Sequence, residues 1–392
     1  MKRIALATFT RAEYGSIAPV MRALDETGEF ETQLIVSGTH LSPWHGKTVD
    51  TICADGVPIA ERVEMQLASD APEGVAKSIG LAMSGFARAM ARLRPELLLL
   101  AGDRTELLAP ATVALLYAIP VVHLSGGEIT EGAIDNQVRH AVSKMSHLHF
   151  VCMAEHARRL HQMGEDPSRV HVTGDPALDT IKRMKAMSLD ELASSLEMKL
   201  DRPITVVTCH PTTLGGMGAE AEVEALLGGL RNLGGSMIVS MPNADVGGRA
   251  ILARLREFSA QRPATKLFSN LGQERYYSLL AQADLMVGNS SSGIWEAPSF
   301  GLPVVNVGDR QRGRTRAGNV IDVEMTADAI RGGIEKALDP AFRRALRGLV
   351  NPYGDGEASR RIARILCGIS DPRSLLQKRF FDSPPEPSPA AG

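Results

Sequence analysis

Aromatic residues and cysteines are scarce in this chain of 392 residues, and each shortage narrows what the protein can be. Aromatic side chains make up 4% of the sequence and no basic run is interleaved with them, so a nucleic-acid-binding surface is not expected. The four cysteines lack the CxxC spacing of a zinc or redox site, and three of them lie in apolar runs. We therefore expect buried free thiols rather than disulfides or a zinc site.

An excess of charge of either sign and a long hydrophobic run are also missing. Lys plus Arg number 43 and Asp plus Glu number 45, which gives a formal net charge of −2. No apolar stretch approaches the roughly 20 residues that a membrane helix needs. Lys2 and Arg3 lead directly into a short apolar run without a signal-peptide pattern. The expectation is a cytoplasmic protein that binds neither nucleic acid nor membrane.

Short apolar runs alternate with amphipathic segments along most of the chain. The length exceeds what one hydrophobic core usually supports, so two domains are expected. Unbroken apolar strands between helices predict parallel sheets covered on both faces, that is, an α/β fold of two Rossmann-like domains. The predicted strands are 4–8, 32–36, 97–101, 121–124, 148–151 and 170–173 in the first domain, and 204–208, 236–240, 266–268, 285–287 and 304–307 in the second.

The same pattern predicts the domain boundaries. The N-terminal domain should comprise residues 1–176 and the C-terminal domain residues 177–364. A C-terminal helix is predicted over 365–382. The Pro-rich segment 383–392 has the composition of a disordered tail.

Carboxylates follow neighbouring strand ends of the predicted first domain, and parallel sheets bind ligands beyond these ends. They are Asp103, Glu128 and Asp135. Grouped carboxylates shift one another's pKa values, which allows a general acid and a general base to share one site. Structural alternatives remain open, because Asp103 could cap a helix with Glu106 completing a capping box, and Asp135 could cap the helix that begins near residue 136.

Cationic groups follow strand ends in both domains. Arg11 comes after the first strand, Arg104 lies beside Asp103, and His210 ends the first strand of the second domain. An arginine can grip phosphate with both arms of its fork, and a histidine can donate to a leaving phosphate or carry a proton. A surface pair of Arg11 with Glu13 and a purely structural His210 are the alternatives.

Four arginines alternate after the last strand of the second domain. We take Arg310 as the candidate that faces phosphate. The others are expected on a solvated face or against the other domain. The four are Arg310, Arg312, Arg314 and Arg316.

Residues 288–293 read Gly-Asn-Ser-Ser-Ser-Gly and join an apolar strand to a helix. Hydroxyl and backbone N–H groups at a helix N-terminus favour an anion such as phosphate; the residues that would supply them are Ser290, Ser291, Ser292 and Gly293. Glu296, one turn later, would repel a diphosphate but accept hydrogen bonds from a ribose diol. The segment is therefore interpreted as a nucleotide site, with a serine-capped solvated loop as the alternative.

The histidines do not indicate a metal site. His147 and His149 alternate on a predicted strand, but no third ligand at the usual zinc spacing follows them. Neither a metal nor another cofactor is expected.

Six segments together make the chain resemble the hydrolysing UDP-N-acetylglucosamine 2-epimerases of the sialic acid and legionaminic acid pathways. They are TRAEYGSIAPVM (10–21), SGTHLSP (37–43), AGDRTELLAPA (101–111), HLSGGEITEGAIDNQVRHAVSKMSHLHF (123–150), VTCHPTTL (207–214) and GNSSSGIWEAPSFGLPVVNVGDRQRGR (288–314). The resemblance implies the GT-B arrangement, in which a nucleotide-sugar cleft separates the domains and a C-terminal helix crosses back to the first domain. It also implies a homodimer or homotetramer.

Two places in the sequence separate this chain from the non-hydrolysing sister class. Non-hydrolysing members typically carry His-Arg-Arg-Glu-Asn where this chain has His-Pro-Thr-Thr at 210–213, and they lack the Asn-Ser-Ser-Ser-Gly form of the serine turn. The resemblance therefore implies conversion of UDP-N-acetylglucosamine and water to N-acetylmannosamine and UDP, through elimination to 2-acetamidoglucal and rehydration.

Residue roles follow from the resemblance. Asp103, Glu128 and Asp135 would form the acid/base set, together with His210 at the leaving group. The remaining contacts would be Arg11, His210, Ser290 and Ser291 to the diphosphate, and Asn243 and Glu296 to uridine and ribose. Gly15 and Ser16 stand where some sialic-acid-pathway members have Ser-Lys, which leaves room for a modified sugar, for instance a 2,4-diacetamido-6-deoxy sugar.

Other functions are less favoured on the sequence. They are a non-hydrolysing epimerase, a GT-B glycosyltransferase and a catalytically silent UDP-sugar sensor. A transferase would need an acceptor site and would not need three carboxylates around the donor sugar.

Overall fold

The computed structural model describes residues 1–43, 46–67, 71–131, 133–212, 217–243 and 245–382, which form two parallel sheets. The predicted tail at 383–392 and residues 213–214 of the VTCHPTTL segment lie outside this part of the chain. The first sheet has the order β3 (Ile59–Val63), β2 (Phe30–Ser37), β1 (Lys2–Thr8), β4 (Leu97–Ala101), β5 (Val121–Leu124), β6 (Leu148–Val151), β7 (Val170–Val172). The second has the order β10 (Thr265–Phe268), β9 (Ser236–Ser240), β8 (Ile204–Thr208), β11 (Leu285–Gly288), β12 (Val304–Val307), β13 (Val320–Val323).

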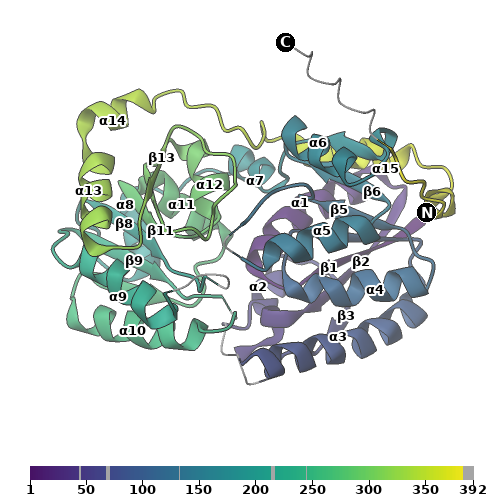
Figure 1. Ribbon diagram of the computed structural model, residues 1–392, viewed down its shortest axis with the longest axis horizontal. Coiled ribbons are helices and arrows are strands. Elements are labelled where there is room, and N and C mark those ends of the chain that lie inside the picture. Colours follow the sequence, from purple (N-terminus) through teal and green to yellow (C-terminus); the bar gives the residue numbers. More distant parts are fainter. Residues whose placement is uncertain (44–45, 68–70, 132, 213–216, 244, 383–392) are drawn as a thin grey trace, which may run out of the picture.

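Helices cover both faces of each sheet, and the two sheets occupy separate halves of the molecule (Figure 1). The fold therefore confirms the prediction of two Rossmann-like α/β domains. The helices around the first sheet are α1 (Arg11–Thr27), α2 (Val49–Ala54), α3 (Pro72–Leu93), α4 (Leu108–Leu116), α5 (Asp135–Met145), α6 (Ala154–Gln162), α7 (Ala177–Arg183) and α15 (Ala358–Cys367). Those around the second are α8 (Leu189–Leu196), α9 (Ala219–Leu230), α10 (Gly248–Gln261), α11 (Gln273–Gln282), α12 (Ser292–Trp295), α13 (Ala327–Leu338) and α14 (Pro340–Ala345).

The strands that the apolar runs predicted are present, including the edge strands β7 and β10, and the central ones among them are largely buried on both faces. Strand β4, for example, reads Leu-Leu-Leu-Leu-Ala and is buried at every position. The sequence did not predict the edge strands β3 and β13, which contain charged residues and are only partly buried. An edge strand needs no continuous apolar run, because one of its sides faces solvent.

The C-terminal helix α15 packs on α1 of the first domain, far from the helices that precede it in the chain (Figure 1). Its residues Ile362, Ala363 and Leu366 belong to the apolar cluster between the first sheet and α1. The predicted boundary at residue 364 falls inside this helix, which ends at Cys367 and not at residue 382. A short 3-10 helix over Pro372–Leu376 follows, and residues 377–382 form no helix or strand.

The strand order indicates the candidate ligand region. In the first sheet, successive strands are added on one side of β1 up to β3 and then on its other side from β4 onwards. In the second sheet the same switch in strand order lies between β8 and β11. Parallel sheets bind ligands outside the carboxyl ends of strands at such switch points. The residues to consider are therefore those that follow β1, β4, β8 and β11. No helix in the described part of the chain has the length and apolar character of a membrane span.

Candidate active site

Each switch-point strand ends in residues that the sequence singled out. Arg11 begins α1 directly after β1, and Asp103 and Arg104 follow β4. In the second domain, His210 follows β8 and Ser290 follows β11. The two halves meet, because Arg11 donates a hydrogen bond to Asn270 of the second domain at 3.2 Å. The alternative of a surface pair between Arg11 and Glu13 is not observed, since Glu13 accepts hydrogen bonds from the backbone N–H groups of residues 9 and 10.

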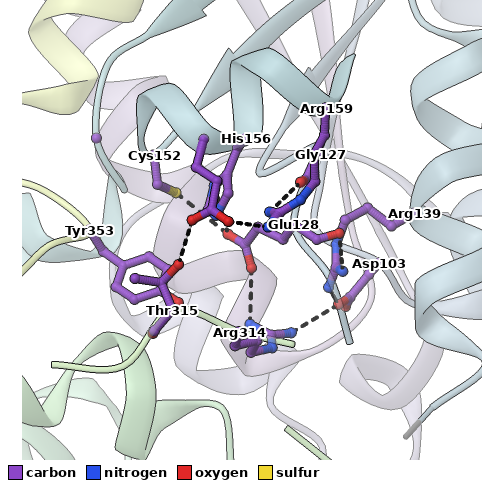
Figure 2. A network of polar contacts seen from close by, with 12 residues as sticks. Asp103, Gly127, Glu128, Arg139, Cys152, His156, Arg159, Arg314, Thr315 and Tyr353 are labelled. Carbon is purple, nitrogen blue, oxygen red and sulfur yellow. Dashed lines mark hydrogen bonds and ion pairs between the residues drawn. The ribbon is translucent and has the colours of Figure 1, made fainter. Parts of the chain in front are cut away.

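Asp103 and Glu128 share one arginine from the other domain (Figure 2). Nη1 of Arg314 lies 3.0 Å from Oε2 of Glu128, and its Nη2 lies 3.2 Å from Oδ2 of Asp103. Arg139 on α5 also pairs with Asp103 and donates to the backbone oxygen of Glu128 at 3.0 Å. The alternative role of Asp103 as a helix cap is therefore wrong, because its carboxylate is engaged by two buried guanidinium groups.

Glu128 is the carboxyl group best suited to exchange a proton near neutral pH. Its side chain is 1% exposed, and this burial raises its pKa to about 7 although Arg314 opposes the shift. The Cys152 thiol donates to Oε1 at 3.6 Å, and burial raises the pKa of that thiol so that it stays protonated. Glu128 can therefore hold or release a proton under cellular conditions.

Asp135 lies apart from this pair in the hydrogen-bond network and faces Arg104. Its Oδ1 is 3.9 Å from Nη1 of Arg104, whose Nη2 lies 2.6 Å from Asp245 of the second domain. Asp135 is the first residue of α5, and Ile134 before it makes no side-chain cap. The capping alternative for Asp135 is therefore wrong. Buried Arg310 interacts electrostatically with the group of Asp135, Arg104 and Asp245 and also with Arg314. Burial lowers its pKa, and Asp135, Asp245 and Arg314 also influence that pKa.

His210 is neutral and its orientation is fixed. Its Nδ1 accepts a hydrogen bond from the backbone N–H of Asn243 at 3.1 Å, so in the neutral ring the proton lies on Nε2. Burial lowers its pKa to about 3, and the neighbouring Arg310 adds to the shift. The side chain of Asn289 also holds the His210 backbone, through hydrogen bonds of 2.8 Å to its N–H and its oxygen. His210 can therefore donate through Nε2 but does not carry a positive charge.

The serine turn lies between β11 and the short helix α12. Ser290 Oγ accepts a hydrogen bond from the backbone of Ser292 at 3.3 Å, and Tyr276 donates to Ser292 Oγ at 2.5 Å. Helix α12 spans only Ser292–Trp295, so the dipole of a long helix does not support an anion here. Local N–H and hydroxyl groups must supply the attraction instead. Glu296 follows directly, and the hydroxyl of Tyr277 donates to its carboxylate at 2.9 Å.

The arginine run splits into two directions. Arg310 and Arg314 point into the protein, whereas the side chain of Arg312 is 67% exposed and Arg316 pairs with Asp322 on β13 at 3.1 Å. The sequence predicts Arg310 as a site residue but not Arg314. It also does not predict Arg139 and Asp245, which pair with Asp103 and Arg104. The arginine spacing carries no signal for Arg314, because residues 309–314 form turns and not a helix.

One group of potential metal ligands occurs in the described part of the chain, namely Glu128, Cys152 and His156. Their ligand atoms lie within 4.8 Å of one another. They are surrounded by the guanidinium groups of Arg159, Arg139 and Arg314. Burial is the main cause that lowers the pKa of His156 to about 3, and these three positive charges lower it further. Because these guanidinium charges repel cations, the group is better suited to hold a proton than a metal ion. His147 and His149 serve structural partners, the Val121 backbone and Glu165.

Carboxylates thus follow strand ends of the first sheet and hydrogen-bond donors follow strand ends of the second, at the ends where parallel sheets bind ligands. Residues 22–367 match the UDP-N-acetylglucosamine 2-epimerase family, and the chain belongs to it. This confirms the family resemblance that the motifs indicated.

Individual relatives cover nearly the whole chain. It is 38% identical to GDP/UDP-N,N'-diacetylbacillosamine 2-epimerase (hydrolyzing) of Campylobacter jejuni, over 97% of this chain and 99% of the relative. It is 36% identical to UDP-N,N'-diacetylbacillosamine 2-epimerase (hydrolyzing) of Legionella pneumophila, over 96% and 99%. Among solved structures, UDP-GlcNAc 2-epimerase of Neisseria meningitidis bound to UDP-GlcNAc has a TM-score of 0.78 at 19% identity, over 94% of this chain and 100% of that one. The last likeness supports the GT-B-like fold.

Proposed function

We propose that this chain is a hydrolysing nucleotide-sugar 2-epimerase, which converts a UDP-linked 2-acetamido sugar and water to UDP and the free sugar inverted at carbon 2. One observation carries this proposal. Glu128 is a buried carboxyl group with a pKa of about 7, and it shares Arg314 with the second carboxylate Asp103. A base of this strength close to a further acid/base group is what proton transfer at a sugar carbon requires.

The chemistry divides into two steps. The hydrogen on carbon 2 is hardly acidic, because no carbonyl is adjacent to it, so its removal must be coupled to departure of a leaving group. A base takes that proton, the carbon 1–oxygen bond to UDP breaks, and a carbon 1–carbon 2 double bond forms. Water then adds to carbon 1 while an acid protonates carbon 2 from the opposite face. Removal and delivery on opposite faces need two separate groups, which suits Glu128 and either Asp103 or Asp135.

Departure of the diphosphate needs donors on the other domain. His210 would donate through Nε2, and Arg11 and Arg310 would supply positive charge. The serine turn would add the hydroxyl groups of Ser290 and Ser291 and the backbone N–H groups of Ser292 and Gly293. Because His210 is neutral, it stabilises the leaving oxygen by hydrogen bonding and not by a full charge.

The nucleoside would lie behind the serine turn. Glu296 is held by Tyr277 in a position to accept hydrogen bonds from the ribose hydroxyls. The side-chain oxygen of Asn243 is buried and has no hydrogen-bond partner among the residues that the structure describes, so it would be available to an N–H group of the uracil base.

We propose a UDP-linked 2,4-diacetamido-2,4,6-trideoxy sugar as the substrate, ahead of UDP-N-acetylglucosamine. The two relatives at 38% and 36% identity are named as 2-epimerases of an N,N'-diacetylbacillosamine nucleotide, which supports this choice. A cavity of about 60 Å³ also borders Arg104 and Asp245. Its other lining residues are apolar (Met65, Val75, Ile79, Ile134 and Val246) or polar (Gln66, Ser78, Thr105 and Glu106), together with Gly38. The apolar part of this lining would suit a methyl group, and the amide and hydroxyl groups would suit an acetamido group.

The test is to incubate the protein with each UDP-sugar in deuterated water and follow products by NMR. We expect UDP release and one deuterium at carbon 2 of the inverted free sugar, with a higher kcat/KM for the diacetamido sugar. Release of UDP without deuterium would exclude the elimination route. A higher kcat/KM for UDP-N-acetylglucosamine would reverse the substrate assignment, and an inverted sugar still attached to UDP would indicate a non-hydrolysing epimerase.

A further inference from the structure

The segment after β12 leaves the second sheet and lies against the first domain. The backbone oxygen of Arg312 accepts a hydrogen bond from the N–H of Glu131 at 2.9 Å, and Thr315 donates to Glu155 at 3.0 Å. Arg314 lies between these two anchors. Arg314 thus belongs to the domain that would bind UDP, whereas the carboxylates that it contacts belong to the other domain.

Arg314 makes three contacts that fix its guanidinium group. Its two Nη atoms each reach one carboxylate, Glu128 and Asp103. Its Cζ lies 4.6 Å from the ring centroid of Trp295, and the side chain is only 4% exposed. An arginine fork stacked on an aromatic ring has little freedom to turn, so both carboxylates are held in one orientation.

Trp295 connects this guanidinium to the serine turn. It is the last residue of α12, which begins at Ser292 in that turn. Tyr353 packs beside Trp295, with ring centroids 6.1 Å apart, and its hydroxyl donates to the backbone oxygen of Thr315 at 3.0 Å. A displacement of α12 or of the 309–316 segment would therefore move Arg314 away from Glu128 (Figure 2).

We propose that Arg314 is a positioning residue through which docking of the UDP-binding domain orients Asp103 and Glu128 and holds Glu128 in its ionised form. The proposal rests on the proposed function and deepens it. Without the guanidinium, Glu128 would remain a buried acid with few stabilising partners and would take up a proton. Removal of the carbon 2 proton would then be confined to the closed protein, in which UDP is enclosed and departs in a controlled way.

Other groups facing Glu128 do not replace Arg314. The charged and titratable groups around it are Arg314, Arg139, Asp175, Cys152, Arg159, Tyr353 and His156. Arg139 is directed to Asp103 and to the backbone oxygen of Glu128, and not to its carboxylate. Arg159 is directed to the backbone oxygen of Gly127 at 3.2 Å and pairs with Glu155. His156 is neutral, and Asp175 works in the opposite direction by raising the pKa of Glu128. Arg314 is thus the main group that favours the carboxylate.

The first test compares Arg314→Gln with Arg314→Lys. In Arg314→Gln we expect kcat to fall about 100-fold. The acidic limb, that is, the rise of kcat/KM with pH that follows ionisation of Glu128, should move to a pH about one unit higher or more, because the carboxylate loses an adjacent positive charge. The affinity for UDP should change less than about threefold, since the nucleotide contacts stay intact. Arg314→Lys should restore the limb partly, because one ammonium can reach only one carboxylate.

Two further variants separate positioning from a structural role. Added guanidinium ion should restore part of the activity of Arg314→Ala, and Trp295→Leu should shift the limb in the same direction but less. Arg312→Gln is the matched control, because this side chain lies on the same segment, is 67% exposed and makes only a surface ion pair with Glu131 at 3.0 Å, so its acidic limb should stay that of the wild type. An unshifted limb in Arg314→Gln, or a parallel loss of UDP affinity and melting temperature, would overturn the proposal.

A measurement without turnover keeps this inference separate from the proposed function. The Glu128 carboxyl carbon can be followed by NMR titration in the wild type and in Arg314→Gln, with Glu128→Gln identifying the signal. A higher pKa in Arg314→Gln supports the proposal even if neither UDP-sugar is consumed, in which case only the function would fail. An unchanged pKa rejects the role of Arg314 even if the enzyme is active.

Discussion

Arg104 and Asp245 form an ion pair across the two domains, with 2.6 Å between Nη2 and Oδ1. Both side chains are 12% exposed, and Arg104 also faces Asp135. Burial alone would lower the pKa of Arg104, but Asp245, Glu106 and Asp135 raise it well above its ordinary value. The loop after β4 and the loop after β9 are therefore held together by charge next to a proposed acid/base residue.

Asp245→Asn should weaken this connection. Removing one partner of a buried ion pair costs about 3–5 kcal/mol, so we expect a clear drop in melting temperature and weaker binding of the UDP-sugar. Asp328→Asn is the control, because that carboxylate is 88% exposed and pairs with Arg331 on the surface. Calorimetry and ligand titration measure both effects. Equal melting temperatures for the two variants would show that the Arg104–Asp245 pair does not stabilise the closed arrangement.

The activity should depend on the ionisation of Glu128. Its pKa is raised from the ordinary 4.5 to about 7, so the base form is lost as the pH falls below about 7 and gained above it. We expect kcat/KM to rise with pH through an acidic limb near 7, and Glu128→Gln to lose about 100- to 10,000-fold in kcat. A limb at the ordinary glutamate pKa in the wild type would mean that another group is the base.

The three carboxylates should be separable from nucleotide binding. Asp103→Asn, Glu128→Gln and Asp135→Asn all lie in the first domain, whereas the proposed UDP contacts lie mostly in the second. We expect each variant to bind UDP within about threefold of the wild type and to lose UDP release from the sugar. Titration calorimetry and a coupled UDP assay provide the two measurements. Full activity in all three would leave no acid/base role for this group.

His210 should act without titrating in the physiological range. Because its pKa is lowered to about 3, no limb near its ordinary value of 6.5 is expected in the pH profile. His210→Gln should reduce kcat by about 100- to 1,000-fold, as expected for loss of one donor to a developing negative charge. His171→Gln, a half-buried position on the edge strand β7, is the control. An equal effect of both substitutions on kcat would speak against leaving-group assistance.

A buried carboxylate far from the site should support the C-terminal segment. Glu165 pairs with Lys144 at 2.7 Å, Lys378 at 2.6 Å and His149 at 2.9 Å, and these hydrogen bonds outweigh burial and lower its pKa to about 2. Its contribution to stability is present above the ordinary pKa of 4.5 and is lost as the pH falls through about 2.

Glu165→Gln should therefore destabilise the protein at neutral pH by about 3 kcal/mol, because two lysines lose their buried partner. Denaturant unfolding measures the difference. The variant should also lose stability less steeply than the wild type between about pH 4.5 and 2. Glu357→Gln, which removes a surface pair with Lys182, is the matched control and should stay within about 1 kcal/mol.

The central strands and the strand-end residues could be predicted because both depend on local patterns. Leu97–Ala101 is apolar at every position, and such a run has no stable place except between two helical layers. The residues that follow this strand lie at its carboxyl end, which is the edge of a parallel sheet where ligands bind. This position does not depend on the rest of the fold. Edge strands β3 and β13 lack this signature, since solvent covers one of their sides.

The partners of those residues could not be predicted in the same way. Arg314 lies 186 residues from Glu128 in the sequence, and nothing in its own run distinguishes it from Arg312. Which arginine enters the site depends on how the 309–316 segment turns against the first domain. The pairing of Arg104 with Asp245, and not only with its neighbour Glu106, likewise requires the two domains to approach each other.

By itself, the sequence determined the two-domain α/β fold, the family and the set of carboxylates and donors at the strand ends, because apolar periodicity and motif spacing are local properties. Only the tertiary structure decided which carboxyl group has a pKa near neutrality and which arginine controls it. Burial and opposite charge set the pKa of Glu128, and both arise from side chains of separate domains that meet only when the chain is folded.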